Sequence, residues 1–269
     1  MENDYFENIK EAFTRQSLVY DDYEKGHATL TFMRNEVRNH VINFLRKGDK
    51  ILELNAGTGT DAVFFAQKGF KVHAIDISHG MILQLKDKVN RYELNELITV
   101  QQCSFTELNN ISNGPFDFIF SNFGGINCSP SLREITKSFP RILTKGGRVT
   151  LVMMPPYCPW EMALVFRVHF ETAFRRLKKN GTNSHIEGKY FNTFYYTPDQ
   201  VIKALGKNFK KLKLQGLASF TPPPYMENFP KKYPALFKSL NTLDKYFSSH
   251  FPFNRFADHY ILTLEYLLS

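Results

Sequence analysis

The sequence predicts an α/β fold in which helices cover both faces of a largely parallel sheet. Three observations carry this prediction. Residues 50–54 form a short apolar run of the kind found in strands buried in parallel sheets. Gly57 and Gly59 follow as a turn, and residues 61–68 then show a helical pattern that ends at a glycine. A second apolar run over 70–75 completes a strand, turn, helix, strand order.

The glycine turn and the acidic residue Asp76 together predict a site for a nucleotide-like cofactor. Gly57 and Gly59 can adopt backbone angles that a Cβ would forbid, and they let a ligand approach the main chain closely. The free amides at the start of the following helix favour an anionic group, such as an amino acid carboxylate. Asp76 stands at the carboxyl end of the second strand, where open α/β sheets bind their ligands, and it can accept hydrogen bonds from both hydroxyls of a ribose.

Two cofactor classes fit this turn. Gly57-x-Gly59-x-x-Ala62 with Asp76 fits the dinucleotide fingerprint, which admits alanine at its third position. Glu53, a carboxylate inside the first strand, is not needed by a plain dinucleotide turn and favours S-adenosylmethionine. The long segment that precedes the first strand also favours it. The NAD-linked interpretation stays open as the less favoured alternative.

Residues 50–81 resemble class I S-adenosylmethionine-dependent methyltransferases, in particular the branch similar to the ubiquinone/menaquinone-type small-molecule enzymes. Glu53-Leu-Asn-Ala-Gly-Thr-Gly59 looks like their motif I, and Asp76-Ile-Ser-His-Gly-Met81 looks like their second motif. Further segments resemble, in order, the family's third strand, fourth strand and glycine turn into the fifth strand: 100–108, 116–125 and 143–152. The resemblance implies a Rossmann-like, seven-stranded methyltransferase sheet with helices on both faces and helical insertions that cover the pocket.

The resemblance also implies an enzyme that uses S-adenosyl-L-methionine and releases S-adenosyl-L-homocysteine. The segment Tyr20-Asp-Asp-Tyr23 resembles the part of these enzymes that folds over the cofactor, and Arg34 is placed to reach the methionine carboxylate. The expected cofactor-binding residues are Tyr20, Arg34, Glu53, Asn55, Ala56, Gly57, Gly59, Asp76, Ile77, Met81, Ser104, Phe105, Ser121, Asn122 and Phe123.

Two positions depart from the family pattern. Asn55 stands where motif I usually has a glycine, and asparagine tolerates left-handed backbone angles better than most residues, so the turn is expected to survive. Ser104 stands where the family usually has an aspartate that contacts the adenine amino group. Adenine recognition is therefore expected from the backbone amide of Phe105 and from apolar stacking. These departures motivate one further alternative, a cofactor-binding protein without catalysis.

A chain of 269 residues can form one α/β domain with a large core. We expect a single helix over 131–143, another over 160–179 and a polar loop that runs to Gly188. The single domain over 1–269 is expected to comprise an N-terminal helical cap (1–47), a cofactor-binding core (48–155), two insertions that cover the substrate pocket (156–196 and 221–256), and a final helix and strands (197–220 and 257–269).

The net charge of +8 falls entirely on residues 156–269, whereas residues 1–155 are neutral, and the second part is also richer in aromatic residues. This asymmetry favours a small, largely apolar methyl acceptor that is aromatic or lipid-like. If the acceptor is also anionic and carries a carboxylate or phosphate, we expect that group to pair with Arg175 or Arg176. An RNA or other nucleic-acid methyltransferase is the alternative. The lysines at 203, 207, 210, 211 and 213 have the spacing of an exposed helix and edge strand, which disfavours nucleic acid as a partner.

Methyl transfer to a hydroxyl group requires a general base, whereas transfer to a neutral amine does not. The candidate catalytic residues are Tyr195, Tyr196 and His185. The two tyrosines immediately precede a helix that Thr197 caps, so they are expected near the carboxyl edge of the sheet. His185 lies in the predicted polar loop.

No stretch approaches eighteen consecutive apolar residues, and the N-terminus lacks the pattern of a signal peptide. The three cysteines have no metal-binding or redox spacing. We therefore expect a cytoplasmic protein with reduced thiols, no metal, no transmembrane segment and a small-molecule substrate. The sequence leaves the oligomeric state open.

Overall fold

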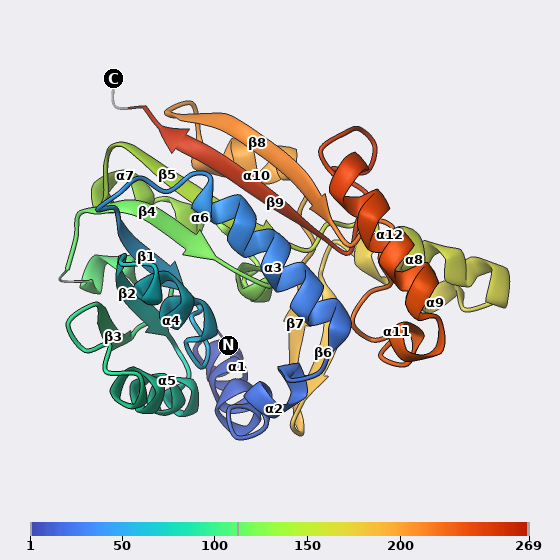
Figure 1. Ribbon diagram of the computed structural model, residues 1–269, viewed down its shortest axis with the longest axis horizontal. Coiled ribbons are helices and arrows are strands. Elements are labelled where there is room, and N and C mark those ends of the chain that lie inside the picture. The colour runs from blue at the N-terminus through green and yellow to red at the C-terminus, as the bar shows by residue number, and fades with distance from the viewer. Residues whose placement is uncertain (1, 112, 268–269) are drawn as a thin grey trace.

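The computed structural model describes residues 2–111 and 113–267 and has the predicted α/β fold (Figure 1). Its centre is a seven-stranded mixed sheet with the order β3-β2-β1-β4-β5-β9-β8. Strands β1 to β5 run parallel, and β9 pairs antiparallel with both β5 and β8. The strands are β1 (Lys50–Leu54), β2 (Lys71–Asp76), β3 (Ile98–Gln102), β4 (Phe116–Ser121), β5 (Leu143–Met153), β8 (Phe209–Leu217) and β9 (His259–Tyr266).

The position of β1 in the sheet decides where a ligand can bind. β1 pairs with β2 on one side and with β4 on the other. The chain therefore winds outward in both directions from β1, and open α/β sheets bind ligands at such a point, beyond the carboxyl ends of the strands. Ile51, Leu52 and Leu54 are fully buried, as expected for a strand covered on both faces.

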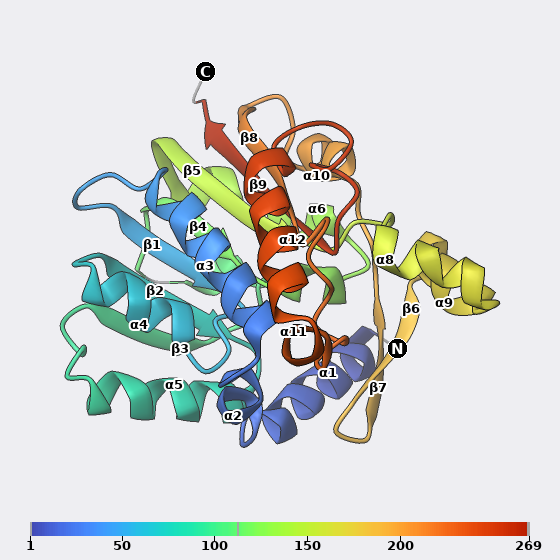
Figure 2. The same cartoon turned by 45° about the vertical axis from the view of Figure 1, so that its right-hand side comes forward.

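Helices form a layer on each face of the sheet. On one face, apolar side chains pack from α3 (Ala28–Ile42), α4 (Thr60–Gln67) and α5 (His79–Arg91). On the other face, they pack from α6 (Leu132–Thr136), α7 (Phe139–Ile142) and α10 (Pro198–Leu205). Thr197 caps α10, as the sequence predicts, and Gln200 completes a capping box with it. α12 (Pro234–Phe247) lies beside α3 (Figure 2), where Lys245 and Glu36 are 3.9 Å apart.

A third group of elements covers the carboxyl edge of the sheet. It contains α1 (Glu2–Gln16), α2 (Tyr20–Glu24) and a hairpin of β6 (Thr182–Ile186) and β7 (Lys189–Thr193). In both views α1 lies against this hairpin (Figures 1 and 2). The Tyr5 hydroxyl lies 2.8 Å from the carbonyl oxygen of Cys128 and 2.7 Å from that of Asn192, so one side chain joins α1 to the hairpin.

The single helices predicted over 131–143 and 160–179 are wrong. The first is two short helices, α6 and α7. The second is a series of short pieces, because Val168 takes a left-handed backbone angle (φ 62°) that no continuing helix can hold. These pieces are α8 (Pro159–Met162), the 3-10 helix η3 (Ala163–Arg167), α9 (Phe170–Phe174) and the 3-10 helix η4 (Arg175–Leu177). The remaining short elements are η1 (Leu108–Asn110), η2 (Gly125–Cys128) and α11 (Phe229–Lys232).

The polar loop predicted to run to Gly188 is also wrong, because that segment forms the β6–β7 hairpin. Glu187 and Gly188 make its two-residue turn with φ values of 45° and 79°. Two consecutive positive φ values are what a type I′ hairpin turn requires. None of the described helices is long and apolar enough to cross a membrane.

Candidate active site

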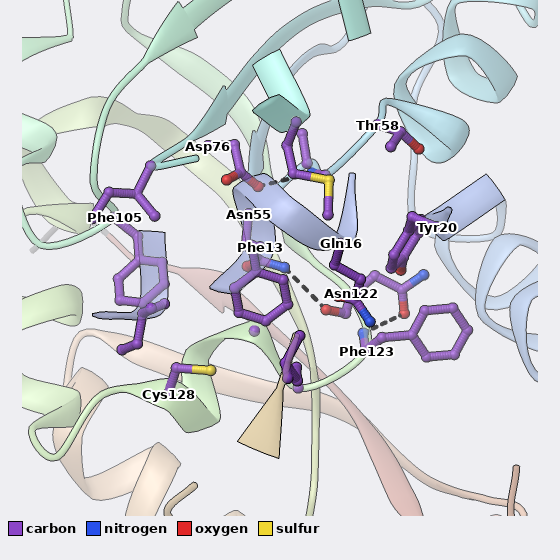
Figure 3. Close-up of a pocket in the computed structure, with 18 of the residues that line it drawn as sticks. Phe13, Gln16, Tyr20, Asn55, Thr58, Asp76, Phe105, Asn122, Phe123 and Cys128 are labelled. Carbon is purple, nitrogen blue, oxygen red and sulfur yellow. Dashed lines mark hydrogen bonds between the residues drawn. The ribbon is translucent and has the colours of Figure 1, made fainter. Parts of the chain in front are cut away.

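A cavity of about 420 Å³ opens at the carboxyl ends of β1, β2 and β4 (Figure 3). Two parts of its wall, formed by different elements, are named separately. The part that we name the sheet-edge half is formed by residues that end or follow these three strands: Glu53, Asn55, Ala56, Gly57, Asp76, Ile77, Asn122 and Phe123. The part that we name the hairpin half is formed by Ile9 and Phe13 of α1, Cys128 of η2, Arg175, and residues 184, 186, 191, 193 and 195 of the hairpin segment.

The glycine turn after β1 has the left-handed backbone that the sequence predicts. Asn55 has a φ of 45°, so the asparagine in the usual glycine position does preserve the turn. Its side chain also has a structural role: Oδ1 accepts a hydrogen bond from Ser121 Oγ at 2.6 Å, and Nδ2 donates to the carbonyl oxygen of Asn122 at 3.0 Å (Figure 3). These bonds tie the turn to the end of β4.

Asp76 lies where the sequence places it, buried at the end of β2 on the cavity wall. Its Oδ2 accepts a hydrogen bond from the Gly57 amide at 2.9 Å, and its Oδ1 accepts one from the Ser78 amide at 2.8 Å. Burial raises the pKa of Asp76 to about 6. A carboxylate has about four acceptor positions, so these two bonds leave capacity for hydroxyl groups of a ligand.

Charged groups gather on the wall next to Asn122. Asp61 accepts hydrogen bonds from Arg34, from Arg38 at 2.7 Å and from Asn122 Nδ2 at 2.8 Å. Burial, and then the nearby Asp61, raise the pKa of Glu53 well above its ordinary value. Glu53 Oε2 is buried and has no hydrogen-bond partner among the described residues. An unpaired buried oxygen costs free energy, so this position fits a ligand that brings a donor, such as a cationic amine.

Arg34 lines the cavity, as predicted, but its charge is already engaged. It pairs with Glu24 as well as with Asp61, and its guanidinium carbon lies 4.7 Å from the centre of the Phe123 ring. Tyr20 also lines the cavity, and burial raises its pKa to about 12. A ligand carboxylate that binds here would therefore contact Arg34 while Glu24 and Asp61 hold its guanidinium in place.

The structure brings most of the expected cofactor-binding residues to the cavity. Those that line it are Tyr20, Arg34, Glu53, Asn55, Ala56, Gly57, Asp76, Ile77, Met81, Phe105, Asn122 and Phe123. Gly59, Ser104 and Ser121 do not. A Cβ at Gly59 would lie 2.6 Å from Leu85 Cγ, so this glycine serves helix packing. Ser104 shares a hydrogen bond with Thr106, and Ser121 holds Asn55.

Of the three candidate catalytic residues, only Tyr195 lines the cavity. Tyr196 packs against the core, and its hydroxyl donates to the carbonyl oxygen of Ser129 at 2.6 Å. His185 is exposed on the other face of the hairpin, 4.6 Å from the ring of Tyr190. Because side chains alternate along a strand, the segment that points Ser184 and Ile186 into the cavity turns His185 away from it.

Arg175 and Arg176, one of which is expected from the sequence to pair with an anionic acceptor, are both paired with protein carboxylates. Both donate to Glu161, at 2.6 Å and 2.7 Å, and Arg176 also donates to Asp258 at 2.7 Å. Only Arg175 lines the cavity. Cys158, Glu161 and Asp258 have ligand-type atoms close together, but the Arg176 guanidinium bonds both carboxylates and provides the positive charge there.

Within the described residues, the segment 221–256 contributes nothing to the cavity wall. It contacts the N-terminal helices instead: Tyr23 donates to Glu227 at 3.1 Å, and His27 Nε2 lies 3.0 Å from the carbonyl oxygen of Pro224. The lysine-rich run of α10 and β8 also lies outside the cavity wall. This placement agrees with the exposed-face interpretation of that run.

Sequence reasoning missed the residues that make the hairpin half apolar. Ile9 and Phe13 are spaced by four residues on α1, and Phe13 lies 5.9 Å from Phe191, ring centre to ring centre. The helical spacing in α1 and the alternation of Ser184 with Ile186 are signals that could have found them. Neither signal tells which other elements of the fold the apolar face of α1 or the inner face of the hairpin packs against.

Comparison with known proteins gives the class. Residues 51–147 match a family model described as a methyltransferase domain. A demethylmenaquinone methyltransferase of Beutenbergia cavernae is 31% identical over 119 residues, which are 43% of this chain and 46% of that protein. A phosphatidylethanolamine N-methyltransferase of Cereibacter sphaeroides is 26% identical over 106 residues, 39% of this chain and 51% of that protein. The chain spans about half the length of these curated relatives.

Solved structures agree on the fold. A 1,6-didemethyltoxoflavin-N1-methyltransferase of Burkholderia thailandensis, solved with S-adenosylhomocysteine, covers 100% of this chain and 91% of its own, with a TM-score of 0.62 and 15% identity. A geranyl diphosphate C-methyltransferase of Streptomyces coelicolor A3(2) covers 81% of this chain and 73% of its own, with a TM-score of 0.53 and 12% identity. The chain thus carries a class I S-adenosylmethionine-dependent methyltransferase domain. The predicted sheet and the methyltransferase class are confirmed, and the match to a methyltransferase domain disfavours the NAD-linked interpretation.

Proposed function

We propose that this protein transfers the methyl group of S-adenosylmethionine to a small, largely apolar acceptor bound in the hairpin half of the cavity. The observation that carries this proposal is the continuity of the cavity. One space joins the glycine turn and Asp76 to an apolar chamber walled by Phe13, Ile186 and Phe191. The cofactor supplies an electrophilic methyl group on sulfur. The protein aligns the acceptor with it and excludes water.

The sheet-edge half has a suitable partner for each part of the cofactor. The free acceptor positions of Asp76 suit the two ribose hydroxyls, and the turn at Gly57 lets the ligand approach the backbone. The unpaired oxygen of Glu53 suits the cationic amine of the methionine part. Ile77 and Phe105 offer apolar surface for the adenine.

The titratable side chains of the hairpin half favour an acceptor that needs no general base. Burial raises the pKa of Cys128 to about 12 and also raises the pKa of Tyr195, so both are protonated at neutral pH. Arg175 is a cation paired with Glu161. None of these described groups can take a proton from an acceptor. The acceptor atom is therefore one that is nucleophilic on its own, such as a neutral amine or ring nitrogen, or an oxygen or carbon acid that ionises without help.

The names of the relatives support a small acceptor. They refer to demethylmenaquinone, phosphatidylethanolamine and 1,6-didemethyltoxoflavin, all of which are small molecules. The apolar lining of the hairpin half agrees with an acceptor that has a ring or a hydrocarbon part.

Calorimetric titration tests the cofactor first. We expect S-adenosylhomocysteine to bind with a micromolar dissociation constant and NAD not to bind. Labelled S-adenosylmethionine is then offered with amines, nitrogen heterocycles, phenols and lipid extracts. Cofactor binding without transfer to any of these fractions would remove the acceptor part of the proposal.

The absence of a base is tested separately with the variant Tyr195→Phe. If Tyr195 only shapes the cavity, the transfer rate at saturating acceptor stays within about threefold of the wild type, whereas removing a general base costs about 100-fold or more. The variant Tyr196→Phe is the matched control, because its hydroxyl bonds Ser129 outside the cavity.

A further inference from the structure

An apolar projection stands out from one end of the molecule. It comprises residues 159–179, which form α8, η3, α9 and η4, and both overall views show α8 and α9 extending beyond the body (Figures 1 and 2). Five large apolar side chains are exposed within twelve residues of it: Phe166 88%, Val168 75%, Phe170 54%, Phe174 45% and Leu177 46%. None of them lines the cavity. Soluble proteins rarely expose such a cluster unless it is an interaction surface.

The base of the projection is fixed to the body. Arg176 is buried and bonds both Glu161 of the projection and Asp258, next to β9. The Trp160 indole donates to the carbonyl oxygen of Phe220 at 3.1 Å. These contacts hold the apolar side chains outward, so their exposure belongs to a defined element of the fold.

The surroundings of the projection are basic. Lys178 and Lys179 are exposed and follow directly on Leu177. The Trp160 ring lies 6.1 Å from the Phe229 ring of α11, and α11 presents exposed Lys231 and Lys232. Residues 156–269 carry the entire net charge of +8.

We infer that the projection docks on the surface of an anionic lipid membrane. Interfacial elements bury aromatic and aliphatic side chains at the boundary between head groups and acyl chains, while lysines contact anionic head groups. Phenylalanines beside lysines match both parts of that surface. The positive charge of the lysines favours an anionic lipid layer as the partner over a second copy of this chain, because the chain itself has a net positive charge.

The projection also reaches the cavity, because Arg175 of η4 is part of its wall. If the proposed function holds, an apolar acceptor dissolved in the lipid layer would meet the hairpin half from the docked side. Docking itself does not depend on that function, since it is measured without turnover.

Co-sedimentation with vesicles tests the inference. The vesicles contain phosphatidylcholine alone or phosphatidylcholine with phosphatidylglycerol, and the protein is the full chain. The variants are Phe166→Ser with Phe170→Ser, and Lys178→Gln with Lys179→Gln. The matched control is Leu18→Ser with Tyr246→Ser, two strongly exposed positions outside the projection (76% and 71%). Leu18 lies in the turn between α1 and α2, and Tyr246 lies on α12. S-adenosylhomocysteine affinity, unchanged in every variant, shows that each one is folded.

We expect the wild type to bind the anionic vesicles, with the phenylalanine variant weaker by about tenfold or more on them. The lysine variant should be weaker by about tenfold on anionic vesicles only, and the control should match the wild type. Wild-type protein that ignores anionic vesicles, or binds them as well without the two phenylalanines, would overturn the inference. A wild-type dimer in light scattering that the phenylalanine variant converts to a monomer would assign the patch to a second copy instead. Binding of S-adenosylhomocysteine without binding to vesicles would refute membrane docking and would not affect the proposed function.

Discussion

Asp76 shows how one side chain can serve both the fold and the ligand. Its two hydrogen bonds from the backbone amides of Gly57 and Ser78 hold the glycine turn against the end of β2. Burial raises its pKa to about 6, although the two hydrogen bonds oppose this shift. The charge of Asp76 therefore changes over the pH range around 6.

We predict that S-adenosylhomocysteine binds more tightly as the pH rises through about 6. Above its pKa of about 6, Asp76 is charged, and a charged carboxylate accepts ribose hydrogen bonds more strongly than a neutral one. Calorimetry at about pH 5, 6, 7 and 8 should show affinity rising to a plateau near pH 7. In Asp76→Asn, the affinity should fall by roughly 10- to 100-fold and lose this pH dependence. The same rise in the variant would show that another group titrates.

The free energy of unfolding of the ligand-free protein is expected to change with pH in the opposite direction to the affinity. The folded pKa of Asp76 is raised from 3.8 to about 6. Its contribution to stability is therefore fully present below about pH 4 and is lost as the pH rises through about 6. Bound cofactor should offset this loss, so the gain in thermal midpoint from S-adenosylhomocysteine should be larger at about pH 7 than at about pH 5.

The side chain of Asn55 is expected to stabilise the glycine turn. Asn55→Ala keeps the positive φ of 45° but removes the bonds to Ser121 and Asn122, so it should cost about 1–3 kcal/mol in the free energy of unfolding. Asn55→Gly removes the same bonds but tolerates the backbone angle, so it should cost less. Urea unfolding measures both, with Asn180→Ala at an exposed position as the control. Equal stability of the wild type and the alanine variant would refute this role.

The elements of the sheet could be predicted because their signals are local. Apolar runs such as 50–54 and 116–121 are bounded by glycine, asparagine or charge, and each lies in a strand that is buried on both faces. The sheet-edge half of the cavity follows from the same motifs. The hairpin β6–β7 could not be predicted in this way, because its turn is Glu187-Gly188 and not one of the common asparagine or aspartate pairs.

The prediction of one helix over 160–179 failed for a different reason. Val168 takes a left-handed backbone angle (φ 62°) that breaks the helix, and a β-branched residue gives no local signal of such an angle. His185 is expected near the site from the sequence alone, but the register of β6 with β7 turns its side chain to the other face of the hairpin. Tyr196 lies beyond the end of β7, and its hydroxyl bonds Ser129, a tertiary contact that the local pattern does not contain.

The hydroxyl of Tyr5 is expected to stabilise the contact between α1 and the hairpin. Tyr5→Phe removes the hydroxyl that lies within hydrogen-bond distance of the carbonyl oxygens of both Cys128 and Asn192, but it keeps the ring. Losing a hydrogen bond of this kind costs about 0.5–1.5 kcal/mol. We therefore expect faster amide exchange in α1 and in β7, measured by mass spectrometry. S-adenosylhomocysteine affinity should stay within about twofold, because the hydroxyl lies outside the sheet-edge half.

Tyr190→Phe is the control for this experiment, since Tyr190 lies on the same hairpin with an exposed side chain. Faster exchange in both variants would mean that any loss of a hydroxyl loosens the hairpin. Unchanged exchange in Tyr5→Phe would mean that apolar packing, such as the contact of Phe13 with Phe191, holds α1 in place without it.

For the whole molecule, the structure explains where the positive charge of residues 156–269 goes. Arg175 and Arg176 are neutralised internally by Glu161 and Asp258. The lysines of β8 lie on the edge strand of the sheet, Lys203 lies exposed on α10, and Lys178 and Lys179 lie exposed at the end of the projection. The uneven distribution of charge can be read directly from the sequence. Which of these charges form buried ion pairs cannot, because the paired residues are far apart in the chain.

The buried pairs carry the last prediction, which concerns the stability of the whole molecule. Arg176 bonds Glu161 and Asp258, so it joins the projection to the end of the sheet at β9. Asp258→Asn leaves the buried guanidinium with one carboxylate fewer. Breaking a buried ion pair by removing one partner costs about 3–5 kcal/mol, and we expect a loss of this size in urea unfolding at neutral pH. Asp199→Asn, the same change in an exposed pair with Arg255, should cost at most about 0.5 kcal/mol.

Acid unfolding separates the charge of Asp258 from its packing. Although burial opposes ionisation, His259 and Arg176 hold the pKa of Asp258 well below its usual value. A carboxyl group with a lowered folded pKa contributes stability above its unfolded pKa of about 4 and loses it as the pH falls further. The wild type should therefore lose stability more steeply than Asp258→Asn below about pH 4, and the two unfolding free energies should converge. A constant difference between them at every pH would mean that the substitution acts through shape, and that the ion pair does not join the projection to the sheet.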